Sequence, residues 1–308
     1  MSHRLRPLTI WLFQDRKPGH IHQLEGLAKR LAAHADIRTQ WIDTTNRRVY
    51  GYCQDAEFLR PTPDIIIGAG HSTHASLIYY KRKYRAFTAV VMTPTLPNML
   101  FDAIISPEHD GLKQGGKILN TKGVINTLTP HPELKKDRNL ILIGGSSKHY
   151  YWQEPELINQ IQSLCKRSAD TLWQLYDSYR TPKSFTEKLA NLGLSNLNFH
   201  PFAHTTSNQL EEALNHCRQC WVTPDSGSML YEALTAGAQV GVFDLQASGA
   251  SRIVKGVAQL VDTRSIIRFA DWQPETSMPR PEKPLWEAER AAIWLLHQYA
   301  NWQEVAFG

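Results

Sequence analysis

The stretch WVTPDSGSMLYEALTAGAQVGVFDL, from Trp221 to Leu245, reads as a strand, a polar turn, a helix and a second strand. The turn carries Asp225, Ser226 and Ser228, and Glu232 follows inside the helix. A helix N-terminus offers oriented N–H groups and a partial positive charge that suit a diphosphate, and a carboxylate near it can accept both hydroxyls of a ribose. Asp225 or Ser226 can also simply cap the helix, but capping requires neither the second serine nor Glu232. The stretch therefore predicts a nucleotide-binding turn.

The length and composition of the chain favour a two-domain globular protein. Its 308 residues exceed a typical single core, and 42% of them are hydrophobic and 20% charged. No apolar run is long enough to cross a bilayer. The basic start MSHRLRP runs into a strand at Leu8 and leaves no room for a signal peptide. We therefore expect a cytoplasmic protein.

The four cysteines fit a reducing compartment. Cys53 and Cys165 are isolated, and Cys217 and Cys220 form one C-x-x-C. A zinc site of this type needs a second pair of ligands, so we expect no metal there. The pattern places the C-x-x-C on the last turn of a helix, where both thiols would be structural.

The charge is concentrated in the first part of the chain. Residues 1–130 hold 17 Lys and Arg against 10 Asp and Glu, and the remainder holds 17 against 19. A basic half suits nucleic acid, anionic lipid or acidic sugars, but no RNA-binding signature is present, so we expect no nucleic-acid partner. Tyr79, Tyr80 and Tyr84 beside the run 81–83 favour a peripheral contact with an anionic membrane, at its inner face. A merely solvated face is the alternative.

Short apolar runs alternate with helical segments along the whole chain, which predicts α/β domains with parallel sheets. The pattern stops at the charged, proline-containing segment 129–139 and then restarts. We expect two Rossmann-like domains facing a cleft, and a C-terminal amphipathic helix. The expected parts are a first domain at 1–130, a second domain at 131–275, and a C-terminal helix at 276–308 that packs back on the core.

Two further loops of the second domain carry residues suited to phosphate. After one strand come two glycines that let a backbone approach a ligand, and two serines whose hydroxyls can hold oxygens. After the next strand comes an arginine, whose planar fork matches phosphate, beside a threonine that can also mark a helix start. The residues of these loops and of the quoted turn that we expect to bind the donor are Gly144, Gly145, Ser146, Ser147, Arg180, Thr181, Asp225, Ser226, Ser228 and Glu232.

The first domain is expected to supply a base. Its first strand ends in the loop 14–20, where His20 can take a proton near neutral pH and Asp15 can orient or replace it. His71, His74, Glu108 and His109 follow two other strands and are rivals for this role. The side chains expected on the acceptor side are those of Lys17, Gly19, His74, Glu108 and His109.

The combined motifs resemble the mitochondrial fission ELM1 family, which is related to GT-B glycosyltransferases. The resemblance covers about residues 14–240 and departs from the family at Arg16, where glycine is frequent, and at 178–180, where the family is richer in arginine. The matching pieces are Asp15 with Lys17-Pro18-Gly19-His20 and Gln23, Pro63-Asp64, Gly68-Ala69-Gly70 with Thr73-His74, Pro107-Glu108-His109-Asp110, Gly144-Gly145, Arg180-Thr181-Pro182, and Thr223, Asp225-Ser226, Ser228-Met229 and Glu232-Ala233.

The GT-B relation implies a nucleoside diphosphate sugar bound by the second domain, a glycan or glycolipid acceptor at the first, and no cofactor or metal. The chain has no Asp-x-Asp, which agrees with metal independence. The expected activity is therefore sugar transfer to a surface-glycan or lipid-linked acceptor. Two alternatives stay open: a nucleotide-sugar 2-epimerase, and a non-catalytic binding or scaffold protein that keeps the fold.

Overall fold

The computed structural model describes residues 6–45, 51–57, 59–280 and 282–307. The chain divides into two units, of which the first combines Met1–Thr127 with Trp286–Gly308 and the second is Leu128–Leu285. The segment before the last helix belongs to the second unit, because the Gln239 side chain donates to the Met278 carbonyl at 3.0 Å. The second unit thus extends ten residues past 275, the end expected for the second domain.

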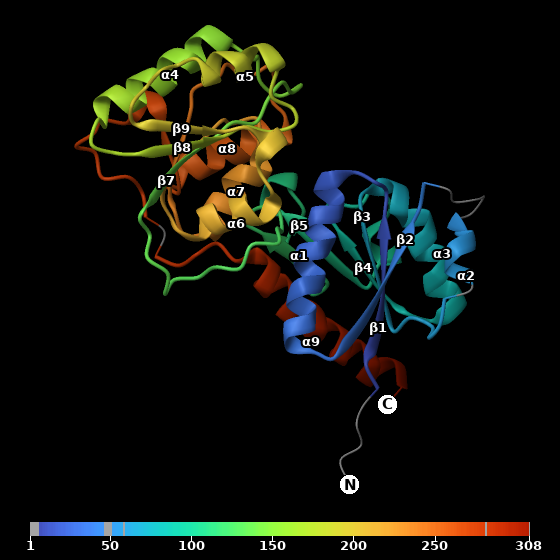
Figure 1. The fold of residues 1–308 in the computed structure, drawn as a ribbon. Helices are drawn as coiled ribbons and strands as arrows, with labels where there is room; N and C mark the ends of the chain where they lie inside the picture. Colours follow the sequence, from blue (N-terminus) through green and yellow to red (C-terminus); the bar gives the residue numbers. More distant parts are fainter. Residues whose placement is uncertain (1–5, 46–50, 58, 281, 308) are drawn as a thin grey trace. The chain divides into compact units, whose positions relative to one another are not determined.

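The first unit contains a six-stranded parallel sheet in the order β2-β1-β3-β4-β5-β6 (Figure 1). Its strands are β1 (Leu8–Gln14), β2 (Ile37–Asp43), β3 (Ile65–Ala69), β4 (Phe87–Val91), β5 (Ala103–Pro107) and β6 (Ile118–Thr121). Its helices are α1 (Pro18–His34), α2 (Gln54–Glu57), α3 (His74–Tyr84) and α9 (Glu287–Phe307).

Helices cover both faces of this sheet, which explains why its strands are apolar without alternation. Ile10 and Leu12 of β1 pack with α1 and α9 on one face. Trp11 and Phe13 point to the other face and pack with α3. Since both faces of a central parallel strand are buried, every position of it favours an apolar side chain.

The C-terminal helix α9 lies beside α1 in the first unit (Figure 1). It occupies Glu287–Phe307 and not the whole of 276–308. Glu289 ties it to α1, pairing with Arg30 at 2.6 Å and with His34 at 2.9 Å.

The second unit contains a six-stranded parallel sheet in the order β12-β11-β10-β7-β8-β9, with α4 and α5 on one face and α6 to α8 on the other (Figure 1). Its strands are β7 (Arg138–Leu142), β8 (Trp173–Tyr176), β9 (Leu197–His200), β10 (Cys217–Val222), β11 (Gln239–Val242) and β12 (Ile267–Arg268). Its helices are α4 (Glu154–Arg167), α5 (Lys183–Ala190), α6 (Ser207–Asn215), α7 (Gly227–Thr235) and α8 (Arg252–Asp262).

The α/β fold class expected from the sequence is confirmed, and each sheet has one point where the strand order changes direction. In the first unit that point lies between β1 and β3, and in the second it lies between β7 and β10. Open parallel sheets bind ligands at the carboxyl ends of the strands that flank such a switch point. These two places are therefore where a functional site is expected.

The placement of the C-x-x-C was wrong. Cys217 and Cys220 lie on strand β10 and not at a helix end, and both are buried.

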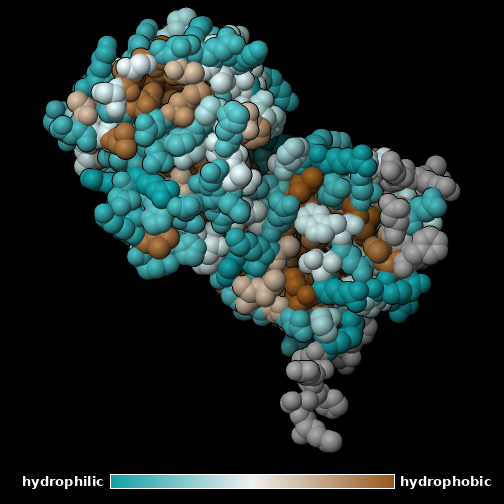
Figure 2. All heavy atoms as spheres, in the orientation of Figure 1, coloured by the Kyte–Doolittle hydropathy of each residue, from teal (hydrophilic) through white to brown (hydrophobic). Residues whose placement is uncertain are grey.

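Within the described ranges, no helix is long and apolar enough to cross a membrane. The face drawn in Figure 2 is mostly hydrophilic, with smaller apolar patches on each unit.

Candidate functional site

The loops after three neighbouring strands of the second unit are tied together at its switch point. The Gly144 N–H, after β7, donates to the Thr223 hydroxyl, after β10, at 2.8 Å. The Gly144 carbonyl accepts hydrogen bonds from the hydroxyls of Ser178 and Thr181, after β8, at 2.5 Å each. The structure thus brings together the three loops that were each identified from the sequence as suited to phosphate.

An ion pair between Arg180 and Asp225 lies at the centre of these loops. The Arg180 Nη2 and Asp225 Oδ2 atoms are 2.8 Å apart, and the Gly145 N–H donates to the same oxygen at 2.9 Å. The Asp225 side chain is 1% exposed, whereas that of Arg180 is 27% exposed. Arg180 is therefore held by a buried carboxylate and still presents part of its guanidinium to solvent.

Gly144 and Gly145 are required by the close packing of the neighbouring loops, and not only by the approach of a ligand. A Cβ on Gly144 would lie 2.3 Å from Asp225 Oδ2, and one on Gly145 would lie 2.1 Å from the Arg180 carbonyl oxygen. Both distances are far below van der Waals contact. The structure thus gives both glycines a packing role that the sequence did not predict, and their role in binding a donor stays a prediction.

Helix α7 begins without a side-chain cap. Ser226 occupies the N-cap position, but its side chain makes no capping hydrogen bond, and the Asp225 carboxylate is directed to Arg180. The alternative that the turn merely caps the helix is therefore not what the structure contains. Ser228 donates to Glu232 Oε1 at 2.9 Å, so its hydroxyl lies beside the carboxylate that was expected to accept the ribose hydroxyls. The first N–H groups of a helix have no intrahelical partner, which leaves this terminus suited to an anion.

The charges of this cluster act on two residues of the β7 loop that the sequence did not single out. Burial lowers the pKa of His149, and the charges of Lys148 and Arg180 lower it further, while Asp225 opposes them. Burial and the Asp225 charge raise the pKa of Tyr150 to about 12. Their position directly after Gly-Gly-Ser-Ser was the signal available in the sequence. Ser146, by contrast, is exposed, and Ser147 Oγ accepts the His149 N–H at 3.2 Å.

A second polar cluster lies at the switch point of the first unit. His20 Nδ1 is 2.9 Å from Asp15 Oδ1, and the Ser72 hydroxyl donates to Asp15 Oδ2 at 2.8 Å. Burial would raise the pKa of Asp15, but the hydrogen bond from Ser72 and the nearby His20 outweigh it and lower the pKa. An ionised Asp15 can only accept, so His20 Nδ1 donates to it and Nε2 is left as the acceptor.

The backbone around this cluster explains why it forms. Gly70 has φ +85°, and a Cβ there would lie 2.4 Å from the His20 ring. Arg16 has φ +61°, so an arginine occupies a left-handed conformation at the position where the ELM1 family often has glycine. Lys17 Nζ lies 3.4 Å from Asp15 Oδ2, while Gly19, in the first turn of α1, has no steric neighbour that demands glycine.

The other residues expected on the acceptor side occupy different surroundings. His74 is 2% exposed, packs edge-on against Phe101 with ring centroids 5.4 Å apart, and has a pKa that burial lowers to about 4. A neutral, buried side chain of this kind does not reach a ligand without a rearrangement. His109 lies beside Asp110 at 3.9 Å, and Glu108 is exposed.

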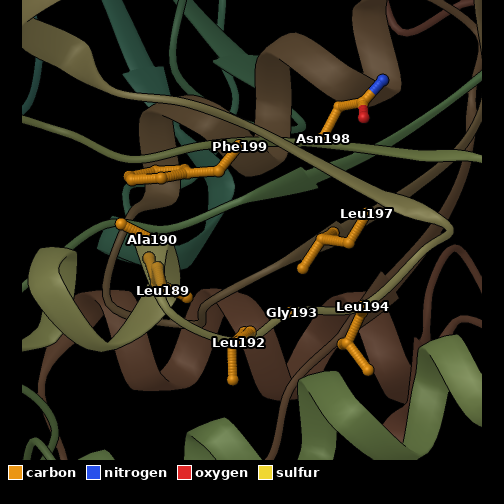
Figure 3. Close-up of a pocket in the computed structure, with 8 residues that line it drawn as sticks. All are labelled: Leu189, Ala190, Leu192, Gly193, Leu194, Leu197, Asn198 and Phe199. Carbon is orange, nitrogen blue, oxygen red and sulfur yellow. The ribbon is translucent and has the colours of Figure 1, made fainter.

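A pocket of about 540 Å³ lies away from these loops, at the end of α5 and along β9. Figure 3 shows that leucines, one phenylalanine and Asn198 line it. With no titratable group in its wall, it offers none of the chemistry expected of the site. Among the residues described, no three His, Cys, Asp or Glu side chains are grouped to hold a metal ion.

Comparisons with known proteins agree with this architecture. A solved structure of UDP-GlcNAc 2-epimerase from Methanocaldococcus jannaschii, in complex with UDP-GlcNAc and UDP, is similar with a TM-score of 0.56 at 12% identity, over 94% of this chain and 100% of that one. MurG of Acinetobacter baumannii is similar with a TM-score of 0.52 at 12% identity, over 95% and 92% of the two chains. These similarities establish a GT-B-like fold.

Sequence comparison adds the family. An uncharacterized protein of Rickettsia prowazekii (strain Madrid E) is 25% identical, in a comparison that covers 77% of this chain and 83% of that protein. The model of the family described as Mitochondrial fission ELM1 matches residues 18–299. With nearly the whole chain matched, the protein belongs to the mitochondrial fission ELM1 family.

Proposed function

We propose that this protein is a metal-independent glycosyltransferase that moves a sugar from a nucleoside diphosphate to a surface-glycan or lipid-linked acceptor, in the cytoplasm at the inner face of the membrane. The second unit holds the donor and the first supplies the base. The observation that carries the proposal is the joining of three strand-end loops, with Arg180 and the uncapped start of α7, at the switch point of the second sheet.

The donor end follows from charge and hydrogen-bonding capacity. Arg180 Nη2 pairs with Asp225, and Nη1 makes long contacts of 3.4 Å with the carbonyl oxygens of Gly145 and Ser146. A guanidinium has five N–H donors, so the Nε–H and the second N–H of Nη2 remain for phosphate oxygens. The first turn of α7 adds N–H groups and a partial positive charge. Glu232 accepts the ribose hydroxyls. The similar archaeal epimerase was solved with UDP, which makes UDP the first nucleotide to try.

The base follows from the Asp15–His20 contact. His20 Nε2 takes the proton of an acceptor hydroxyl while Asp15 stabilises the imidazolium that forms. The hydroxyl oxygen bonds to the anomeric carbon, and the bond from that carbon to the diphosphate breaks. The electron pair leaves with the diphosphate, whose charge Arg180 and the helix terminus stabilise.

The test is a calorimetric comparison of UDP, other nucleoside diphosphates and the matching nucleosides. Arg180→Ala should weaken diphosphate binding about 10- to 150-fold and leave nucleoside binding nearly unchanged, since a hydrogen bond to a charged group contributes about 1.5–3 kcal/mol. Equal losses for both ligands would mean that Arg180 acts only through folding. Failure of every nucleoside diphosphate to bind the wild type would sink the proposal.

Arg180→Ala also leaves the Asp225 charge buried without this partner, so a matched variant is needed. We expect a stability loss of about 2–3 kcal/mol, below the roughly 3–5 of a fully buried pair because part of Arg180 is exposed. The double variant Arg180→Ala with Asp225→Asn removes the orphaned charge and should regain part of that stability. Diphosphate affinity should not return with it, which separates the two roles.

Incubation with a bound donor alone distinguishes the remaining alternatives. Without an acceptor, an epimerase converts the donor to its epimer, whereas a transferase gives at most slow hydrolysis. A second incubation with a range of acceptors separates a transferase, which then consumes the donor, from a scaffold, which leaves it unchanged.

A further inference from the structure

His149, in the loop after β7, carries an imidazole whose buried nitrogen has no hydrogen-bond partner among the residues that the structure describes. That nitrogen is Nδ1, whereas Nε2 reaches the surface of the half-buried side chain. A buried polar atom without a partner is unfavourable, and where a native protein keeps one it often belongs to a binding or catalytic site. His149 is therefore a candidate for contact with a ligand.

The backbone at His149 is fastened to the loop after β11. The His149 carbonyl accepts the Ser248 N–H at 3.0 Å, and the next residue, Tyr150, forms an antiparallel bridge with Ala247. On the other side, the Ser248 hydroxyl donates to the Lys148 carbonyl at 2.6 Å. A side chain on a backbone held in this way has a fixed starting point, which is what preorganised binding requires.

Charged groups of three loops act on the imidazole. Burial lowers the pKa of His149, Lys148 and Arg180 lower it further, and only Asp225 opposes them. The segment 246–248, which pairs with this loop, has no charged side chain. The protein without a bound anion therefore keeps this imidazole neutral near pH 7.

A second buried atom of this cluster also has no partner. Asp225 Oδ2 lies 2.8 Å from the Arg180 guanidinium and accepts the Gly145 N–H at 2.9 Å. Oδ1 of the same side chain, which is 1% exposed, receives no hydrogen bond within the described ranges. Arg180 thus does not exhaust the capacity of this carboxylate, and Asp225 can act as the counter-charge of a second cation.

A bound diphosphate would reverse the balance of charge around the imidazole. It brings several negative charges beside Arg180 and the start of α7, and an opposite charge nearby favours the protonated form of a histidine. The ordinary pKa of histidine is close enough to 7 for such a change in its surroundings to charge it.

We propose that His149 binds the diphosphate of the donor as an imidazolium, with its Nε2–H donating to a phosphate oxygen. The proton comes from solvent as the nucleotide binds and returns to solvent when the nucleoside diphosphate leaves. Arg180 contacts the same diphosphate, and Asp225 supplies the counter-charge for both cations. The inference rests on the proposed function, because it adds a residue to the donor site of the second unit.

Calorimetry with UDP near pH 7.5, in two buffers of different ionisation enthalpy, measures the proton directly. A phosphate with a second pKa of about 6 is ionised at this pH, so a proton taken up belongs to the protein. The wild type should take up a large fraction of one proton per UDP. Its affinity for UDP should fall by up to about tenfold per pH unit between about pH 7 and pH 8.5, because the complex holds one proton more than the free protein.

His149→Gln cannot be protonated, so it should take up no proton and should bind UDP about tenfold more weakly than the wild type near pH 7. The two proteins should converge in affinity as the pH rises. His216→Gln removes a histidine just before β10, at the opposite edge of the same sheet, and should behave as the wild type. Uridine has no phosphate and should bind without proton uptake.

Binding of UDP to the wild type without proton uptake would overturn the inference and leave the proposed function intact. This measurement needs no variant, so it decides the matter even if His149→Gln does not fold. Equal pH dependence in the wild type and His149→Gln, or equal proton uptake with uridine, would also overturn the inference. If neither UDP nor any other nucleoside diphosphate binds, the proposed function fails and this inference fails with it.

Discussion

Replacing His74 by Gln should remove an acid-sensitive contribution to the stability of the first unit. His74 is buried against Phe101, and its Nδ1 lies 3.3 Å from the Thr95 hydroxyl. Burial, with a smaller effect of His71, lowers the pKa of His74 from 6.5 to about 4. The folded chain therefore holds this imidazole neutral over a range in which the unfolded chain protonates it.

The sign and size of the effect follow from proton linkage. The stabilising contribution is complete above a pH of about 7 and is lost as the pH falls through the folded pKa, because the unfolded state then binds more protons. With values of 6.5 unfolded and about 4 folded, the loss is about 2 kcal/mol near pH 5 and about 3 kcal/mol near pH 4. Glutamine does not titrate, so His74→Gln lacks this term.

Urea unfolding near pH 8 and near pH 5 measures this contribution of His74 to the free energy of unfolding. Between these conditions the wild type should lose about 2 kcal/mol more stability than His74→Gln, because the comparison cancels the other titrating groups. His71→Gln alters an exposed neighbour and should follow the wild type. Equal losses in the wild type and His74→Gln would refute the reasoning and return His74 to the list of side chains able to meet an acceptor.

Three further outcomes are expected. Gly145→Ala puts a Cβ 2.1 Å from a backbone oxygen, so it should lower the free energy of unfolding by about 1–3 kcal/mol and weaken diphosphate binding. Gly227→Ala, where a Cβ would have nothing within 4 Å, should melt like the wild type. Equal melting temperatures of the two variants would mean that the loop at Gly145 relaxes freely. His20→Ala should lower turnover ~10²–10⁴-fold with donor affinity unchanged, and Asp15→Asn should lower it less; wild-type turnover in both would move the base elsewhere. Glu232→Gln should weaken a ribonucleotide but not its 2′,3′-dideoxy analogue in calorimetry, and parallel losses would remove the ribose assignment.

The fold was predictable because its signals are local. Apolar runs bounded by polar or glycine-containing loops identify parallel strands without any knowledge of their partners. The same reasoning placed Asp15, Gly144 and Asp225 at strand ends. It failed at Cys217, because the helical pattern of α6 runs on to the start of β10 with no glycine or proline between them.

The pairing of Asp15 with His20, five positions away, could be predicted, but the other partners within the two clusters could not because they are distant in the chain. Arg180 and Asp225 are 45 positions apart, and Ser72 is 57 positions from the carboxylate it binds. From residue types alone, an arginine in a loop is as readily expected to bind phosphate as to pair with an aspartate. The burial of His74 was hidden for the same reason, since Phe101 reaches it from a different loop.

The two clusters share one construction. In each unit a buried aspartate at the switch point holds the residue assigned to chemistry, Asp15 holding His20 and Asp225 holding Arg180. In each, a glycine is required because a Cβ would collide with one member of the pair, with the His20 ring at Gly70 and with the Asp225 carboxylate at Gly144. Both aspartates act through their partners. Substituting either one should therefore mainly change the orientation of its partner side chain, and should have a smaller effect on the charge that the ligand meets. The effects of removing an aspartate and its partner should consequently be far from additive, which a double-mutant cycle on either pair would measure.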